Sequence, residues 1–199
     1  MESEHAHWSR IFSGSSFYYG LEPGSIARRA VKYARSLHNS GGCALDAGCG
    51  EGQDLLLLAQ SGYDALGLDF TREGIDKARM LLDQNKQSAR LEVADLLNWQ
   101  TDERFDLVLS INCLQFLGDE APRELQKLQS LVAPGGVFGF SAFARENSGD
   151  EAQSDGVYRF HLDELLLNFP NWQPFEAARL WQWGASGPQP FVTLIAGKL

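Results

Sequence analysis

Residues 44–52 read Ala-Leu-Asp-Ala-Gly-Cys-Gly-Glu-Gly, so a short apolar run is followed by a carboxylate and three glycines. Glycines let the backbone turn sharply and let a ligand approach amides that no side chain shields. The spacing of Gly48, Gly50 and Gly52 differs from the G-x-G-x-x-G of dinucleotide-binding turns. Asp46, two residues before the first glycine, would repel a pyrophosphate. The turn therefore favours a ligand that is cationic near Asp46, such as one with an ammonium group.

Two further acids follow short apolar runs. Asp69 ends the run at residues 65–68, where a carboxylate can accept both hydroxyls of a ribose, and Asp95 follows the run at residues 91–93. Taken alone, each acid fits a helix cap or a loop carboxylate better than a ligand group. Successive parallel strands end at one crevice, however, so the three acids together predict one ligand site.

A parallel sheet would bring these acids together. Apolar runs without polar alternation suit strands buried on both faces, and they occupy residues 43–47, 65–68, 91–93, 105–109, 137–140 and 191–196. Apolar residues spaced as on one helix face, with Thr71 as an N-cap, predict helices at residues 24–37, 52–60, 71–84 and 120–131. The alternation predicts an α/β, doubly wound sheet with helices on both faces.

Composition excludes several classes of protein. The chain has 199 residues, 44% of them hydrophobic and 22% charged, which suits a single globular domain over residues 1–199. The longest apolar run, residues 55–59, is far shorter than the roughly 20 residues of a membrane span. The net charge of −9, with no run of Lys or Arg, argues against nucleic acid as a partner.

The three cysteines, Cys43, Cys49 and Cys113, have no C-x-x-C spacing. They indicate buried small side chains in a reducing compartment, and we expect neither a disulfide framework nor a metal site. The first residues, Met-Glu-Ser-Glu-His, lack the apolar stretch of a signal peptide. We therefore expect a cytoplasmic protein, as a monomer or a weak dimer.

In their order along the chain, these segments resemble class I S-adenosylmethionine-dependent methyltransferases. The resemblance covers residues 40–143 and rests on Asp-Ala-Gly-Cys-Gly-Glu-Gly from Asp46, on Asp69 and Asp95, on Phe-Asp-Leu-Val-Leu-Ser from Phe105, and on Leu-Val-Ala-Pro-Gly-Gly from Leu131. It implies a mostly parallel seven-stranded sheet with one antiparallel strand, which residues 175–183 and 191–196 would close as a hairpin.

The resemblance also implies the cofactor, S-adenosyl-L-methionine, and its contacts. Gly48 and Gly50 would pass under the methionine part, and Asp46 would lie near its amino group. Asp69 would bind the ribose, and Asp95 the adenine amino group. The remaining implied contacts are Tyr19 and Cys49, Phe70 beside the adenine, Leu96 on its ring, Ile111 through its backbone, and Gln115 near the methyl group.

A closer likeness is to small bacterial methyltransferases of the tellurite-resistance type, which share the Gly-Tyr-Asp step at residues 62–64. Before the last strand that family carries a His-Arg pair near its oxyanion substrate, whereas residues 180–184 read Leu-Trp-Gln-Trp-Gly. An aromatic-lined pocket for an organic acceptor is therefore as well supported as a site for tellurite or selenite.

Two regions outside the alternation are assigned to the substrate. Residues 1–21 are rich in aromatic side chains and could form a lid, with Tyr18 on the substrate; residues 144–190 hold a polar loop, 144–160, and a helix. Solvated tail and tolerated insertion are the alternatives. Further candidates are Arg145, Arg159 and Trp183 for substrate binding and His161 as a general base, although such side chains are also common on surfaces.

The expected reaction is in-line transfer of a methyl group to a small-molecule acceptor, with S-adenosyl-L-homocysteine as product. A general base is needed only where the acceptor must lose a proton. Two alternatives stay open: a domain that binds the cofactor and transfers nothing, and a nicotinamide-dependent reductase, which the glycine spacing and Asp46 disfavour.

Overall fold

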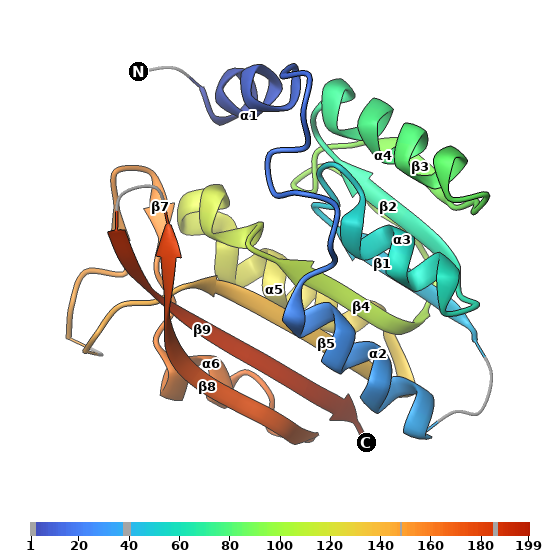
Figure 1. Ribbon diagram of the computed structural model, residues 1–199. Helices are drawn as coiled ribbons and strands as arrows, with labels where there is room; N and C mark the ends of the chain where they lie inside the picture. Colours follow the sequence, from blue (N-terminus) through green and yellow to red (C-terminus); the bar gives the residue numbers. More distant parts are fainter. Residues whose placement is uncertain (1–2, 38–40, 148, 185–186) are drawn as a thin grey trace.

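Seven strands form one sheet in a computed structural model that describes residues 3–37, 41–147, 149–184 and 187–199 (Figure 1). Their order across the sheet is β3-β2-β1-β4-β5-β9-β8. The strands are β1 (Cys43–Ala47), β2 (Asp64–Asp69), β3 (Arg90–Val93), β4 (Phe105–Ile111), β5 (Val132–Phe143), β8 (Trp172–Gly184) and β9 (Gly187–Lys198).

The strand directions confirm the predicted sheet. Strands β1 to β5 pair in parallel, while β9 is antiparallel to both of its neighbours, β5 and β8. The predicted closing hairpin is confirmed, since β8 and β9 pair along their length from Trp172↔Lys198 to Gly184↔Gly187. β9 is therefore the one antiparallel strand of the sheet.

Helices cover both faces of the sheet (Figure 1). One face carries α2 (Ser25–Leu37), α3 (Gln53–Gln60) and α4 (Arg72–Gln84), and the other carries the 3-10 helix η1 (Leu114–Glu120), α5 (Ala121–Leu131) and α6 (Leu162–Leu167). Successive strand residues point to opposite faces, so Ala44 packs with the first group and Leu45 with the second. Burial on both faces explains the unbroken apolar runs.

Two segments differ from the sequence-based expectation. Residues 4–12 form α1 (Glu4–Phe12), which starts where the Ser3 hydroxyl accepts the Ala6 amide at 3.2 Å, and which the sequence interpretation did not include. The polar segment 144–160 is not wholly loop, because it contains a small hairpin of β6 (Gln153–Ser154) and β7 (Val157–Tyr158). Among the described residues, no helix could span a membrane and no cluster of side chains could hold a metal ion.

Candidate functional site

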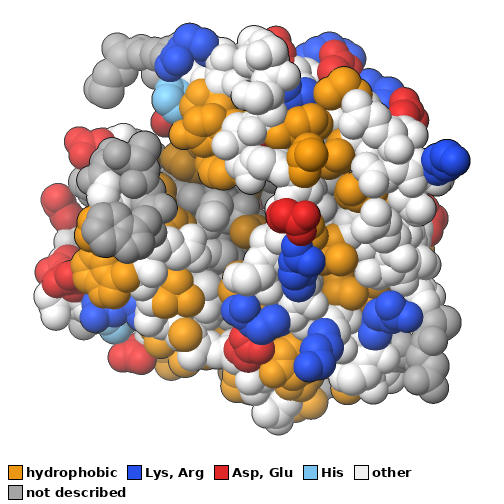
Figure 2. Space-filling view, viewed as in Figure 1, with side chains coloured by type: hydrophobic (Ala, Val, Ile, Leu, Met, Phe, Trp, Pro, Cys, Tyr) orange, Lys and Arg blue, Asp and Glu red, His pale blue; other side chains and the backbone are white. Residues whose placement is uncertain are grey.

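A cavity of about 360 Å³ opens at the carboxyl ends of β1, β2 and β4. The chain crosses from one side of the sheet to the other at β1 and β4, and open α/β sheets bind ligands at such a switch point. The surface is hollowed beneath α1, with hydrophobic side chains along the upper rim (Figure 2). All residues expected to hold the cofactor, Gln115 excepted, line this cavity: Tyr19, Asp46, Gly48, Cys49, Gly50, Asp69, Phe70, Asp95, Leu96 and Ile111.

The glycine turn after β1 leaves no room for side chains. Gly48 has φ +81°, and a Cβ added there would lie 2.3 Å from the Cys113 Sγ atom. Gly50 has φ +51°, and its Cβ would lie 3.3 Å from the Phe12 ring. The amides of Gly48 and Cys49 both donate to the Leu68 carbonyl at 2.8 Å. The turn is thus fixed against the end of β2, and its backbone lines the cavity.

Asp69, the last residue of β2, is held by three hydrogen bonds. Its Oδ2 atom accepts the Gly50 amide at 2.9 Å, and its Oδ1 atom accepts the Thr71 amide at 2.9 Å and the Thr71 hydroxyl. Burial raises the pKa of Asp69, and these hydrogen bonds oppose the rise. A carboxylate offers about four acceptor positions. Asp69 therefore keeps acceptor capacity for a ligand hydroxyl while its orientation is fixed.

Asp46 is 3% exposed, and its Oδ2 atom has no hydrogen-bond partner. Burial raises the pKa of Asp46 well above its ordinary value, and the carboxylates of Asp54 and Asp69 raise it further. A buried carboxylate oxygen without a hydrogen-bond partner is costly, and a cationic ligand group in the cavity would offset that cost. The orphaned oxygen thus fits the ammonium group of S-adenosylmethionine.

The third expected acid, Asp95, lies in a more open part of the cavity. Its oxygens accept the Leu97 amide and the Asn98 side-chain amide, both at 2.9 Å, so it also stabilises the turn after β3. Leu96, beside it, is 6% exposed, and Phe70 contacts the His5 ring edge-on with centroids 5.4 Å apart. Apolar surface at this end of the cavity suits a planar ring such as adenine.

Residues 13–24, between α1 and α2, are joined by hydrogen bonds to the residues at the start of α3. Glu51 is 1% exposed; it accepts the Tyr18 amide at 2.8 Å and pairs with the Lys77 ammonium at 2.7 Å. Gln53 donates to the Gly20 carbonyl at 2.7 Å, and Asp54 accepts the Gly24 amide at 2.6 Å. These contacts hold Tyr19 at the cavity.

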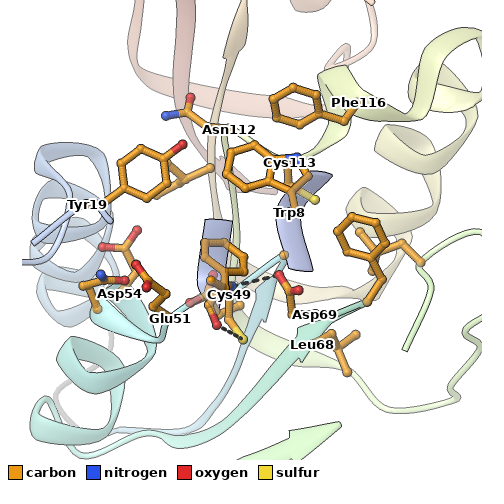
Figure 3. A pocket seen from close by; sticks show the side chains of 18 of the residues that line it. Trp8, Tyr19, Cys49, Glu51, Asp54, Leu68, Asp69, Asn112, Cys113 and Phe116 are labelled. Carbon is orange, nitrogen blue, oxygen red and sulfur yellow. Dashed lines mark hydrogen bonds between the residues drawn. The ribbon is translucent and has the colours of Figure 1, made fainter. Parts of the chain in front are cut away.

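Aromatic rings line the side of the cavity opposite Glu51, Asp54 and Asp69. Trp8 on α1 contacts Phe116 on η1 edge-on with centroids 5.3 Å apart, and its ring lies 6.4 Å from that of Tyr19. Figure 3 shows these three rings on one side and the carboxylates of Glu51, Asp54 and Asp69 on the other. A bound molecule would meet carboxylates on one side and flat apolar surface on the other.

The structure does not bring the expected arginines to this cavity. Arg145 is 8% exposed; it pairs with Glu164 and donates to the Asp150 carbonyl at 2.8 Å, because α6 packs beside the loop. Arg159 donates to the Val157 carbonyl at 3.4 Å within the small hairpin. Neither residue lines the cavity.

His161, Gln115 and Tyr18 also lie outside the lining. His161 is the residue before α6, on the opposite face of the sheet from α2 to α4, and its Nδ1 atom is buried without a partner. Gln115 is 1% exposed within the first turn of η1, and Tyr18 packs edge-on against Tyr19 at the surface. The side chain of Trp183 lies outside the part of the chain that the structure describes.

Sequence reasoning missed Trp8, Phe12, Asn112, Cys113 and Phe116 as cavity residues. For one of them the residue type gave an indication in the sequence, since asparagine directly after a strand is common where φ is positive. In the structure Asn112 has φ +54°. Its amide donates to the Ser141 carbonyl at 2.8 Å, and its Oδ1 atom accepts the Ser141 hydroxyl at 3.0 Å. β5 thus fixes the backbone that follows β4.

Residues 44–136 match a family described as "Methyltransferase domain". This match, over just under half of the chain, supports a class I S-adenosylmethionine-dependent methyltransferase. The ubiquinone biosynthesis O-methyltransferase of Actinobacillus pleuropneumoniae is 30% identical over 107 residues, which are 51% of this chain and 45% of that protein. The chain spans about half the length of the curated relatives it matches.

Two solved structures have the same fold as this chain. TehB from Haemophilus influenzae is 18% identical, with a TM-score of 0.74, and the match covers 98% of this chain and 67% of that one. The N-methyltransferase NodS from Bradyrhizobium japonicum, solved with S-adenosylhomocysteine, is 17% identical with a TM-score of 0.72, and the match covers 99% of each chain. The likeness to the tellurite-resistance type is thus one of fold.

Proposed function

We propose that this chain binds S-adenosylmethionine in the cavity and transfers its methyl group to a small-molecule acceptor. The observation that carries the proposal is Asp46, whose buried Oδ2 atom lacks a partner at the cavity wall. The family match at residues 44–136 and the S-adenosylhomocysteine bound to NodS support it.

Different residues would contact different parts of the cofactor. Asp46 would accept hydrogen bonds from the amino group, the backbone of Gly48 and Gly50 would lie against the methionine part, and Asp69 would accept the ribose hydroxyls. Phe70 and Leu96 would enclose the adenine, with Asp95 at its amino group. When bound, S-adenosylmethionine supplies a methyl group on an electrophilic sulfonium, so the protein mainly positions the acceptor and excludes water.

We also propose roles for three parts of the domain. Residues 40–143 would hold the cofactor, and residues 1–21, tied to the turn before α3 through Glu51 and to α4 through Lys77, would cover it. No described residue of 144–190 lines the cavity, so we place the acceptor contacts in α1 and in residues 111–117 instead.

The alternatives fit the cavity less well. A nicotinamide cofactor would bring a pyrophosphate to the turn beside Asp46, where the unpartnered carboxylate would repel it. A domain that binds cofactor without transfer would need a blocked acceptor side; Trp181, one of the side chains that could block it, is 54% exposed and does not line the cavity.

Calorimetry with S-adenosylmethionine, S-adenosylhomocysteine and NADH tests the proposal directly. We expect both sulfur ligands to bind and NADH to give no heat. Transfer of labelled methyl to a panel of amines, thiols, phenols and selenite then separates a transferase from a binding domain. Lack of binding of either sulfur ligand at millimolar concentration would overturn the proposal.

A further inference from the structure

The charged side chains of the cavity all have one sign. Glu4, Asp46, Asp54, Asp69 and Asp95 line it, together with Glu22 and Glu51, and no Lys, Arg or His is among the described lining residues. Lys77 and Arg28, which pair with Glu51 and Glu22, are not part of the lining. Carboxylates in a partly enclosed site repel an anionic ligand, and the effect is larger there than in open water.

The apolar part of the lining is aromatic. Trp8, Tyr19 and Phe116 form it, and Phe116 packs against Phe143 with centroids 6.0 Å apart, which in turn contacts Phe191 at 5.0 Å. This row of rings links α1, η1, β5 and β9. A rigid aromatic wall of this kind favours a planar acceptor that stacks on it or meets it edge-on.

Most of the lining carboxylates already have another role. Asp46, Asp69 and Asp95 are assigned to the cofactor, and Glu22, Glu51 and Asp54 bind Arg28, Lys77 and the Gly24 amide. Apart from Glu4, the lining therefore offers little that could take a proton from an acceptor. Burial raises the pKa of the thiols of Cys49 and Cys113, and His161 lies outside the lining. An acceptor that needs no deprotonation fits these surroundings, namely one whose nucleophilic atom already carries a lone pair in its neutral form.

We propose that the acceptor is an uncharged, flat molecule that contacts Trp8 and Phe116 and presents a neutral nitrogen or sulfur atom. The inference rests on the proposed function. The lone pair of that atom forms the new bond to the methyl carbon, the carbon–sulfur bond of the cofactor breaks, and its electron pair stays on sulfur. The positive charge passes to the acceptor and remains in the carboxylate-lined cavity, whereas an oxyanion would find no cation among the described lining residues.

The test is a panel of flat ring systems, each supplied as a carboxamide and as the carboxylate of the same shape, with selenite as an inorganic oxyanion. Binding to the full chain saturated with S-adenosylhomocysteine is measured by calorimetry or ligand-observed NMR. We expect the carboxamides that bind to do so about tenfold more tightly than their carboxylates, a difference within the range that like-charge contacts produce. With labelled S-adenosylmethionine, members with a free ring nitrogen or sulfur should accept the methyl group.

Two variants locate the effect. Trp8→Ala should weaken carboxamide binding about tenfold, the loss of one aromatic contact. Trp181→Ala is the matched control, because Trp181 is 54% exposed and outside the lining, and it should leave binding unchanged.

The outcomes separate the inference from the proposed function. If S-adenosylhomocysteine itself fails to bind, the proposed function is wrong. If it binds but no carboxamide is preferred over its carboxylate, or selenite competes for the site, the inference is overturned and the proposed function stands. Equal losses in the Trp8 and Trp181 variants would also overturn it, since they would show that the aromatic wall does not hold the acceptor.

Discussion

The Gly50 amide donates to the Asp69 carboxylate at 2.9 Å, so the glycine turn after β1 and the end of β2 form one rigid unit. Both carboxylate oxygens of Asp69 are directed by backbone or side-chain donors before any ligand arrives. The Asp69 side chain would therefore lose little further conformational freedom when it binds a ligand hydroxyl.

Asp69→Asn tests the role of this carboxylate. The amide keeps the size of the side chain but replaces one acceptor oxygen with a donor, which would face the Gly50 or Thr71 amide. We expect the affinity for S-adenosylhomocysteine to fall by about 1–3 kcal/mol, the cost of losing a charged hydrogen-bond partner. Calorimetry measures it. Asp76→Asn is the control, because Asp76 is exposed on α4 and pairs with Arg79; an equal loss there would contradict the assignment.

Asp46→Asn should separate stability from binding. The folded-state pKa of Asp46 lies above its unfolded value, so the stability that its neutral form provides is complete below the unfolded pKa. It is lost as the pH rises through the folded pKa. The variant has no such proton to lose. We expect it to be more stable than the parent at pH 8, by about 1–2 kcal/mol, with the difference shrinking as the pH falls.

The same variant should bind the cofactor more weakly. A neutral amide attracts an ammonium group less than a carboxylate, so we expect a loss of about 1–3 kcal/mol in the affinity for S-adenosylhomocysteine at pH 8. In the parent, affinity should decline as the pH is lowered through the raised pKa of Asp46, while the affinity of Asp46→Asn stays flatter. Parallel pH profiles would show that Asp46 does not contact the ligand.

Lys77→Met tests the attachment of the N-terminal segment. It leaves the Glu51 carboxylate, 1% exposed, with the Tyr18 amide but without its cation. Breaking a buried pair costs about 3–5 kcal/mol, and urea unfolding should show a loss of that order. Residues 13–24 should also become more sensitive to protease.

Two variants control this experiment. Glu51→Gln combined with Lys77→Met removes both charges and should recover part of the loss, because no buried charge is then left unpaired. Arg79→Met breaks the exposed pair with Asp76 and should change stability by less than about 0.5 kcal/mol. Equal effects of Lys77→Met and Arg79→Met would mean that Glu51 is not held by Lys77.

Local patterns predicted the strands and helices of residues 43–143. β1 was predicted at its observed bounds because it is buried on both faces and bounded by glycines, and Thr71 caps α4 as expected through the Gly74 amide at 3.3 Å. The acids at the ends of β1, β2 and β3 lie at the same edge of the sheet, because the carboxyl ends of parallel strands share one edge.

The acceptor side could not be predicted in this way. Trp8 and Phe116 meet only through tertiary packing of α1 over η1, and nothing in the spacing of their neighbours indicates it. Likewise, the sequence around Arg145 indicates only an arginine in a polar loop. Its pairing with Glu164 depends on where α6 packs. Long-range contacts decide which polar residues reach a cavity.

At Gly48, conformation and space both exclude a side chain. Gly48→Ala places a Cβ at φ +81° and 2.3 Å from Cys113 Sγ. We expect a loss of about 2–4 kcal/mol in unfolding free energy, from left-handed strain and from overpacking. Gly62→Ala isolates the strain, since Gly62 has φ +86° with nothing within 4 Å, and it should cost about 1–2 kcal/mol. The added Cβ would also lie 2.6 Å from the Cys113 Cβ atom, so only Cys113→Gly removes both obstructing atoms. In a Cys113→Gly background, Gly48→Ala should therefore cost no more than Gly62→Ala does, and an undiminished cost would mean that Cys113 is not the obstacle.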